Sequence, residues 1–313
     1  MHYELNALTT VTEVMLMHKR KMFRHFHISD IFIYGFVLFI VLITLYPFLN
    51  VVALSFNDST DSTRGINMIW PREWTLDNYR RLVQYENLPH SAFISLLRTI
   101  IGTVTGLFSA AIVAYTLSRK DYVFRRAISF LFVATMYISG GIIPWYLLIV
   151  NIGLNTSFWV YIIPGLLSAW NIIIIRSFMD NLPYELQESA MIDGAGDFYI
   201  FWRVILPLCM PVLATVSLWI AVGQWNSWFD TFIFHSSRPQ YSTLQFELMK
   251  VLGSTSAGNQ QGRISNAPGL MRAVSPLSVR MAITVVVTVP ILLVYPFIQR
   301  FFVTGMTLGA VKS

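Results

Sequence analysis

The side chains that most often do chemistry are few in this sequence, and they are not grouped. Catalytic and metal sites need His, Cys, Asp or Glu at spacings that bring them together on a helix or in a loop. The six histidines all fall outside the long apolar runs, at His2, His18, His25, His27, His90 and His235. The single cysteine, Cys209, lies inside an apolar run and is expected to be a packing residue, because a disulfide needs a second cysteine. We therefore expect neither a catalytic residue nor a metal site, and an enzyme is not indicated.

Energy coupling gives a second test of function. The phosphate-binding pattern G-x-x-x-x-G-K-[ST] is absent, since the only lysine followed by Ser or Thr is Lys312, which Val311 precedes. Transporters driven by protons or sodium usually carry carboxylates or histidines within their spans, whereas the apolar runs here contain neither, and apart from Arg300 near the end of the last run their one charged residue is Arg98. Two interpretations of Arg98 stay open: a snorkelling or hydrogen-bonded structural side chain, and a role in a permeation path. The pattern favours a permeation unit that is passive or driven by another protein.

The composition is that of a membrane protein. Of the 313 residues, 55% are hydrophobic and 12% are charged, and this charged share is about half that of soluble domains. The net charge of +6 comes from 22 basic and 16 acidic residues, and basic residues cluster beside apolar runs at 19–24 and 119–126. Such clusters are topology signals, so nucleic acid is not expected as a partner.

Six apolar runs are long enough to cross a bilayer, which takes roughly 20 helical residues. They lie near 31–55, 92–117, 127–150, 157–175, 204–225 and 281–303. Prolines inside them need neighbouring helices to satisfy the freed carbonyl groups, which favours a packed bundle with kinks. We predict an all-α membrane protein, with a tail over 1–28 and a six-span domain over 29–313.

The basic clusters set the orientation. If 19–24 and the short loop 118–126 are cytoplasmic, the outer loops, 56–91 and 227–279, hold only dispersed basic residues. Both termini are then cytoplasmic. The first run is too long for the core of a cleaved signal peptide, so we expect it to remain as a span.

The cytoplasmic loop over 179–203, between the fourth and fifth runs, predicts a short surface helix. Asn181 or Leu182 would cap its start, Pro183 suits its first turn, and Gly194 would end it.

The faces of this short helix differ. Glu185 lies near the positive end of the helix dipole, where a carboxylate is stabilising. Leu186, Ala190 and Gly194 share one face at a spacing of four. Small residues on that face would let another protein approach the backbone closely.

The same loop carries a resemblance to a known family. Its motif begins with Glu188-Ser189-Ala190, continues after three residues with Gly194, and ends after nine more residues with Val204-Ile205-Leu206-Pro207. This motif resembles the loop of the permeases of binding-protein-dependent ABC importers, which has E-A-A, three residues, G, nine residues and then I-x-L-P. The departures from that pattern are Ser189 in place of Ala and Val204 in place of Ile. Segments that look like the carbohydrate-uptake branch of the family, including permeases for uronic-acid oligosaccharides of the alginate type, lie at 140–146, 168–171, 223–230 and 305–311.

The resemblance implies the type I importer permease fold, alternating access, and a coupling helix that docks into a cytoplasmic ATPase subunit. We therefore name residues 179–203 the coupling loop. The residues that the resemblance assigns to ATPase coupling are Glu185, Glu188, Ser189, Ala190, Asp193, Gly194, Leu206 and Pro207.

The resemblance also implies partners. These are a second, similar permease, two ATPase subunits that bind ATP and Mg, an extracytoplasmic solute-binding protein and membrane lipid, in the inner (cytoplasmic) membrane of a bacterium. The chain itself would need no cofactor. The cargo would be a sugar or an oligosaccharide, uronic-acid-containing in the finer interpretation. The alternative is a stand-alone channel or facilitator of the same topology, which does not need a coupling helix.

A sugar path needs aromatic faces that stack on pyranose rings and polar groups that bond the ring edges. Candidates near span ends are Tyr137, Trp170, Asn171, Trp219, Gln224, Trp225, Asn226 and Trp228. For each aromatic residue the alternative is the membrane-interface belt or core packing.

The second outer loop is the expected docking place of the binding protein. A short helix is predicted over 242–252, followed by a polar segment over 253–262 that either reaches the ligand site or is a linker. An anionic substrate would be attracted by Arg98, Arg263 or Arg272.

Overall fold

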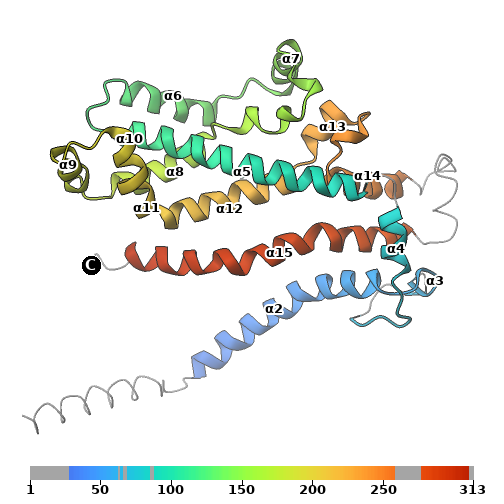
Figure 1. Cartoon of the computed structure of the whole chain (residues 1–313). Coiled ribbons are helices and arrows are strands. Elements are labelled where there is room, and N and C mark those ends of the chain that lie inside the picture. The colour runs from blue at the N-terminus through green and yellow to red at the C-terminus, as the bar shows by residue number, and fades with distance from the viewer. Residues whose placement is uncertain (1–27, 63, 66–68, 85–87, 258–275, 310–313) are drawn as a thin grey trace, which may run out of the picture.

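The computed structural model describes residues 28–62, 64–65, 69–84, 88–257 and 276–309, and every regular element within them is helical (Figure 1). The long helices are α2 (Ile28–Ser55), α5 (Leu88–Ser118), α12 (Met210–Asn226) and α15 (Pro276–Gly309). The shorter α-helices are α3 (Ser59–Ser62), α4 (Asp77–Gln84), α6 (Arg125–Tyr137), α7 (Ile142–Asn151), α8 (Ala169–Asp180), α9 (Glu185–Ile192), α10 (Asp197–Tyr199), α11 (Leu206–Leu208), α13 (Phe229–His235) and α14 (Leu244–Ala257). There is one π-helix, η4 (Ile200–Ile205), among the described residues. The short 3-10 helices are η1 (Leu154–Thr156), η2 (Phe158–Tyr161), η3 (Ile163–Gly165) and η5 (Pro239–Tyr241). The predicted all-α architecture is confirmed.

Among the described residues, three helices are long and apolar enough to cross a membrane unbroken: Asp30–Ser55, Leu88–Ser118 and Leu277–Val294. Three further candidates are bent pairs, and counting each pair as one span gives up to six. The six apolar runs fall on these six candidates. Their exact limits as membrane crossings stay a prediction.

The bends lie where the sequence weakens the helix. Between α6 and α7 the axis turns by 117°, and the break holds Gly141 with a φ of +83°, a conformation that other residues rarely adopt. Between α11 and α12 the turn is 83°, and Cys209 lies at the break. Pro207 and Pro211 flank it, and prolines there donate no backbone hydrogen bond to the preceding turn. The η3–α8 pair bends by only 45°.

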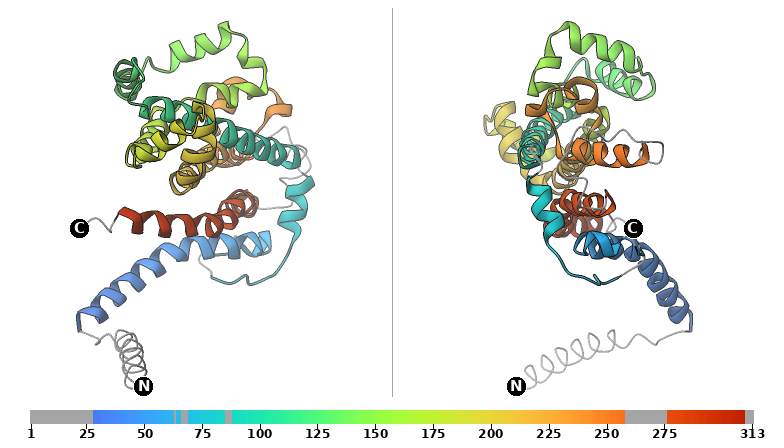
Figure 2. Two further views of the ribbon diagram at one scale, coloured as in Figure 1. Left: turned by 60° about the vertical axis from the view of Figure 1, so that its left-hand side comes forward. Right: turned by 90° about the vertical axis from the view of Figure 1, so that its right-hand side faces the viewer.

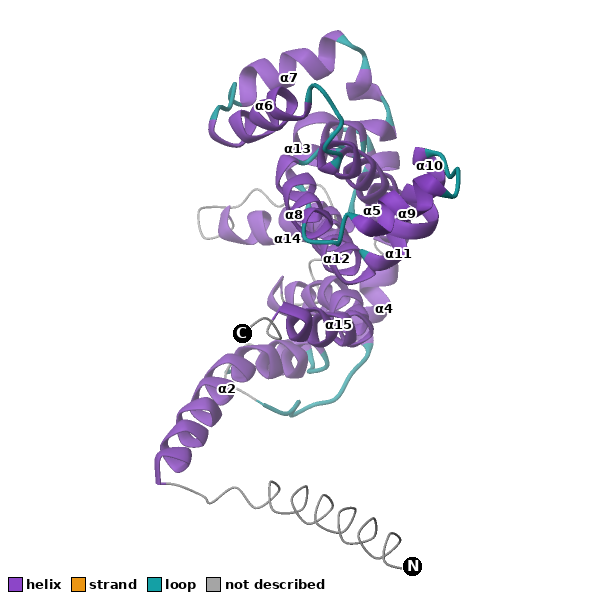
Figure 3. Cartoon of the chain, turned by 90° about the vertical axis from the view of Figure 1, so that its left-hand side faces the viewer, coloured by secondary structure: helices purple, strands orange, loops and turns teal. Residues whose placement is uncertain are grey.

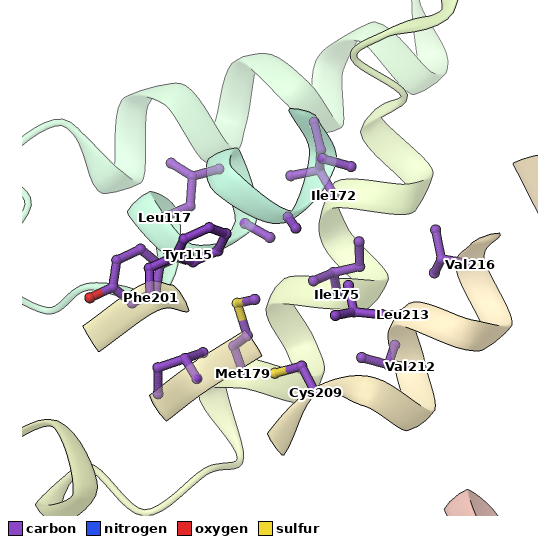
Figure 4. Packing of buried hydrophobic residues seen from close by; sticks show 14 of the residues in the cluster. Tyr115, Leu117, Ile172, Ile175, Met179, Phe201, Cys209, Val212, Leu213 and Val216 are labelled. Atoms are coloured by element: carbon purple, nitrogen blue, oxygen red, sulfur yellow. The ribbon is translucent and has the colours of Figure 1, made fainter. Parts of the chain in front are cut away.

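Helix α5 lies at the centre of the fold, in contact with α8 and α12 (Figure 1). Small residues on α5 allow close packing: a Cβ added at Gly106 would lie 3.7 Å from the side chain of Ile220 on α12. Figure 4 shows the main core cluster, built from the inner halves of α5 and α8, the elbow η4–α11 and the start of α12. Cys209 is fully buried in this cluster, as expected of a packing residue.

Helix α2 lies at the edge of the molecule. Its outer end packs beside α15, while its first half extends away from the other helices (Figure 2). Large apolar side chains along that half are exposed, for example Phe32 at 73% and Phe36 at 64%. This surface is suited to lipid or to a second membrane subunit rather than to water.

Candidate coupling site and substrate path

Helix α9 is the centre of the coupling loop. It begins at Glu185 with Tyr184 at the capping position, whereas Asn181 or Leu182 was predicted as the cap and Pro183 in the first turn. The reason is that Asn181 ends the preceding helix instead, where its side-chain Nδ2 donates to the carbonyl of Ser177 at 2.7 Å. Pro183 therefore lies in the tight connection that separates α8 from α9.

Gly194 ends α9 in the predicted way. Its φ is +79°, its backbone N–H donates to the carbonyl of Met191 at 2.9 Å, and the N–H of Ala195 donates to the carbonyl of Ala190 at 2.9 Å. This pair of bonds is a Schellman motif, in which a left-handed residue satisfies the last carbonyl groups of a helix. Apart from its two neighbours, no described residue lies within 4 Å of a Cβ added at Gly194, so its surroundings are open for a partner.

The exposed face of α9 carries three acidic side chains. Its exposed residues are Glu185, Leu186, Glu188, Ser189, Ile192 and Asp193. Ile192, 86% exposed, belongs to this face although the sequence pattern did not single it out. Ala190 is instead half-buried against the core cluster of its own chain. Its small side chain allows α9 to lie close to that core, and the predicted contact of Ala190 with a partner stays a prediction.

Arg119, at the end of α5, ties the coupling loop to the bundle, and it was predicted only as a topology signal. Its guanidinium lies 3.0 Å from a carboxylate oxygen of Asp197 on α10 and donates to Gln187 Oε1 of α9 at 3.3 Å. It also donates two hydrogen bonds of 3.1 Å to Asp121, which hold the pKa of that carboxyl below its usual value. Any displacement of α9 or α10 therefore acts directly on α5.

The coupling loop leads into an elbow formed by α10, η4 and α11. Leu206 is half-buried and packs against the core cluster, whereas Pro207 is exposed. Both residues lie just before the 83° turn at Cys209. The predicted role of Leu206 and Pro207 in coupling stays a prediction, and their position suits residues that set the angle of the elbow.

The eight candidates for the sugar path fall into three groups. Four are exposed in the described chain: Tyr137, Trp170, Trp219 and Asn226. Asn171 is half-buried in the first turn of α8, where its N–H donates to Ser168 Oγ at 3.5 Å. The first four side chains can meet a substrate or another subunit.

The remaining three candidates make contacts within the chain. Trp225 donates its indole N–H to the carbonyl of Val287 on α15 at 2.9 Å. The Trp228 ring packs edge-on to Phe229, with ring centroids 5.7 Å apart. Gln224 packs against α5, where its Oε1 accepts a hydrogen bond from Arg98 and a Cβ added at Gly102 would come within 2.7 Å of its Nε2. These contacts are structural, and any further role in the sugar path stays a prediction.

Arg98 does not snorkel to the membrane surface. Its side chain is 2% exposed and forms an ion pair of 2.6 Å with Asp230 on α13. It also donates to Gln224 Oε1 at 3.0 Å, and its guanidinium lies 4.4 Å from the centre of the Tyr161 ring. Of the two interpretations left open by the sequence, the hydrogen-bonded structural one matches this geometry.

A second layer of polar contacts continues from Tyr161 into the outer loop. The Tyr161 hydroxyl donates to the carbonyl of Tyr241 at 2.6 Å and lies 2.8 Å from His235 Nδ1. Burial, together with the charge of Arg238, lowers the pKa of His235 to about 4, so the ring is neutral at physiological pH. The layer fixes α13 and η5 against the outer end of the fourth span.

The helix predicted over 242–252 is displaced and longer than expected. Helix α14 begins at Leu244, whose backbone N–H donates to Ser95 Oγ at 2.8 Å, and it ends at Ala257. The first part of the predicted polar segment is therefore helical. The rest of that segment, with Arg263 and Arg272, lies outside the described residues.

Comparisons with known proteins agree with this architecture. Residues 102–308 match the family described as binding-protein-dependent transport system inner membrane component. The polygalacturonan/rhamnogalacturonan transport system permease protein YtcP of Bacillus subtilis is 38% identical over 91% of this chain and 98% of its own length. The arabinooligosaccharides transport system permease protein AraQ of Halalkalibacterium halodurans is 28% identical over 88% of this chain and 94% of its own length.

A solved structure is also similar over most of the chain. It belongs to a bacterial ABC transporter involved in the import of the acidic polysaccharide alginate, and it covers 89% of this chain with a TM-score of 0.78 and 27% identity. The match covers 99% of that solved chain. Because the family match spans more than half of the sequence, this chain belongs to the inner membrane components of binding-protein-dependent transport systems, the non-catalytic permease subunits of ABC importers.

Proposed function

We propose that this chain is the permease subunit through which an ATP-driven importer moves an oligosaccharide from an extracytoplasmic solute-binding protein into the cytoplasm. A second, similar permease and two ATPase subunits complete the assembly, and ATP and Mg bind to the ATPase subunits. The observation that carries the proposal is the exposed acidic face of α9, ended by Gly194 and joined to α5 through Arg119. A stand-alone facilitator would have no use for such a helix.

The cargo we propose is an oligosaccharide that contains uronic acids. The supporting relatives are a permease named for polygalacturonan and rhamnogalacturonan and a transporter for the acidic polysaccharide alginate. Tyr137, Trp170 and Trp219 leave aromatic surface open, at 85%, 54% and 43% exposure, and aromatic faces suit pyranose rings. Asn226 adds an exposed amide that can hydrogen-bond a ring edge.

The partnership is tested by purifying the chain after co-expression with its genomic neighbours. We expect an ATPase subunit to co-purify with the wild type and its hydrolysis of ATP to rise when the solute-binding protein is added. Gly194→Arg places a long side chain in the open space beside α9 and should remove the ATPase subunit. If no ATPase subunit co-purifies with the wild type, the facilitator alternative replaces this proposal.

The cargo is tested in proteoliposomes that contain the purified complex. We expect ATP-dependent uptake of labelled oligogalacturonates to exceed that of labelled maltodextrins. Trp219→Ala should reduce uptake, while Trp70→Ala, which changes an exposed tryptophan of the first outer loop, serves as the matched control. Faster uptake of maltodextrins would refute the uronic-acid cargo and leave the permease assignment intact.

A further inference from the structure

A cavity of about 340 Å³ opens between the inner ends of α5, α6 and α8. The ends of α5 and α8 that line it lie on the same side of the molecule as the coupling helix α9 (Figure 1), and this side faces the viewer in Figure 3. Leu117, Phe132 and Ile172 contribute to its apolar walls. Arg176, Ser129 and Asp180 make its polar part. The cavity thus joins an apolar interior to a charged rim at the cytoplasmic side.

The rim carries excess positive charge. Arg176 donates to Ser129 Oγ at 2.5 Å, and its Nε lies 3.4 Å from a carboxylate oxygen of Asp180. Arg125 is not itself a lining residue, but it borders the cavity through Asp180, because its guanidinium lies 3.6 Å from the same oxygen. Two guanidinium groups therefore share one carboxylate and leave one unit of positive charge. The three side chains are 20 to 35% exposed, so this charge is only partly screened by water.

The lining distinguishes between anions that could bind here. A uronic-acid oligosaccharide needs flat aromatic faces and a rim of hydrogen-bonding groups, but the apolar walls are mainly aliphatic, and Phe132 is the one aromatic residue among the lining residues described. Aliphatic walls suit acyl chains. Helix α6, which forms one of these walls, also exposes the apolar side chains of Phe130 (71%) and Leu131 (61%).

We propose that this cavity binds an anionic phospholipid of the inner leaflet, with the lipid phosphate between Arg125 and Arg176 and the beginning of an acyl chain along the aliphatic walls. The cytoplasmic leaflet supplies anionic lipids at this depth, and arginine matches a phosphate through paired hydrogen bonds. Asp180 and Asn181 end α8 immediately before the coupling helix, so a bound lipid braces the start of the coupling loop.

The proposal is tested on the complex purified with its co-purifying subunits, in nanodiscs of phosphatidylcholine. Spin-labelled phosphatidylglycerol and spin-labelled phosphatidylcholine are the probes, and the immobilised fraction of each gives its relative affinity. We expect the wild type to prefer phosphatidylglycerol. Arg125→Gln and Arg176→Gln should each reduce that preference about fivefold, the weight of one basic residue at an anionic membrane surface, and Arg176→Lys should retain most of it.

Two further variants separate the cavity from general surface charge. Arg126→Gln removes an exposed arginine next to Arg125 that, among the described residues, forms no ion pair with the cavity residue Asp180, and it should leave the preference unchanged. Val133→Trp keeps every charge but fills the apolar part, so it should reduce immobilisation of phosphatidylglycerol as strongly as Arg176→Gln. The thermal unfolding midpoint shows whether each variant folds. If Arg176→Gln does not fold, Val133→Trp still tests the proposal.

Four results would overturn the proposal. The first is equal immobilisation of the two lipids by the wild type, and the second is an equal loss in Arg126→Gln and Arg176→Gln. The third is a preference present in the isolated subunit but absent from the complex, which would mean that the second permease covers the cavity. The fourth is competition by soluble glycerol phosphate as effective as that by the lipid, which would indicate a site for a free phosphate ester.

Discussion

Neutralising Asp230 should destabilise the protein far more than removing Arg98, although the two residues form one ion pair. Asp230→Asn leaves the Arg98 guanidinium charged, 2% exposed and held only by neutral acceptors such as Gln224 Oε1. An uncompensated buried charge of this kind costs about 3–5 kcal/mol. Arg98→Met leaves a carboxylate that is 16% exposed and still accepts from Ser227 Oγ and the N–H of Thr231. We expect its cost to be about 1–3 kcal/mol, that of a polar group short of one partner.

The double variant completes the cycle. In Arg98→Met/Asp230→Asn no buried charge remains, so its cost should fall below the sum of the single costs by about 2 kcal/mol. The measurement is the free energy of unfolding in detergent micelles titrated with sodium dodecyl sulfate. Arg80→Met is the control, because its ion pair with Asp77 is 74% and 61% exposed and should contribute little.

Two results would refute the reasoning. Additive costs, or equal costs in the two single variants, would mean that Arg98 and Asp230 do not share a dry environment. A second refutation would come from transport: if Arg98→Met kept its stability but abolished uptake in proteoliposomes, Arg98 would act on the substrate rather than on the fold. The prediction therefore decides between the two interpretations that the sequence leaves open.

Three further predictions concern the coupling loop and the outer layer. Gly194→Ala should weaken binding of the ATPase subunit roughly 5- to 30-fold, because a left-handed non-glycine residue costs about 1–2 kcal/mol. Gly194→Asn should weaken binding less, since asparagine tolerates the left-handed conformation. Arg119→Ala should preserve ATPase co-purification but lower the stimulation of ATP hydrolysis by the binding protein, because α5 loses its link to Asp197. The stability of the protein should fall by up to about 3 kcal/mol as the pH drops from 6.5 to about 4, and His235→Gln should flatten that profile.

The sign of the pH effect follows from proton binding. The pKa of His235 is about 4 in the folded protein, below its ordinary value of 6.5, so between these values the unfolded chain binds more protons. Stability is then greatest above the upper value and is lost as the pH falls through the window. An unchanged profile in His235→Gln would contradict this assignment.

The coupling-loop predictions also have contradicting outcomes. ATPase loss in Gly194→Asn as severe as in Gly194→Arg would show that the open space, rather than the backbone conformation, requires glycine. Equal loss of ATPase subunit in Arg119→Ala and Gly194→Arg would show that Arg119 only folds the loop. Arg126→Ala, a change of an exposed arginine seven positions further along the chain, is the matched control for Arg119→Ala.

The helices and the end of α9 could be predicted from the sequence, because each depends on residues that are close together in the chain. Apolar runs predicted the helices, because a span needs a continuous apolar segment. Gly194 predicted the end of α9, because its left-handed conformation is a property of one position. The start of α9 was misplaced since Asn181, Leu182 and Pro183 suit the end of one helix as well as the start of the next.

The remaining features depend on partners that are distant in sequence. Arg98 and Asp230 are 132 positions apart, and a single sequence carries no sign that they meet. Arg119 was interpreted only as a topology signal, because its contact with Gln187 lies 68 positions away. The angle at Gly141 was equally hidden, since the apolar run continues through the break while the axis turns by 117°.

These long-range contacts indicate which parts of the permease move together. Helix α5 is one unbroken helix of 31 residues, joined to α13 at its outer end through Arg98 and to α10 at its inner end through Arg119. A displacement of the coupling loop must therefore carry α5 and the outer layer with it, because both ends are fixed by ion pairs to charged partners. The breaks between α6 and α7 and between α11 and α12 hold no comparable link across them in the described residues. We expect the bending that alternating access requires to occur at those two breaks, with α5 as the rigid element between them.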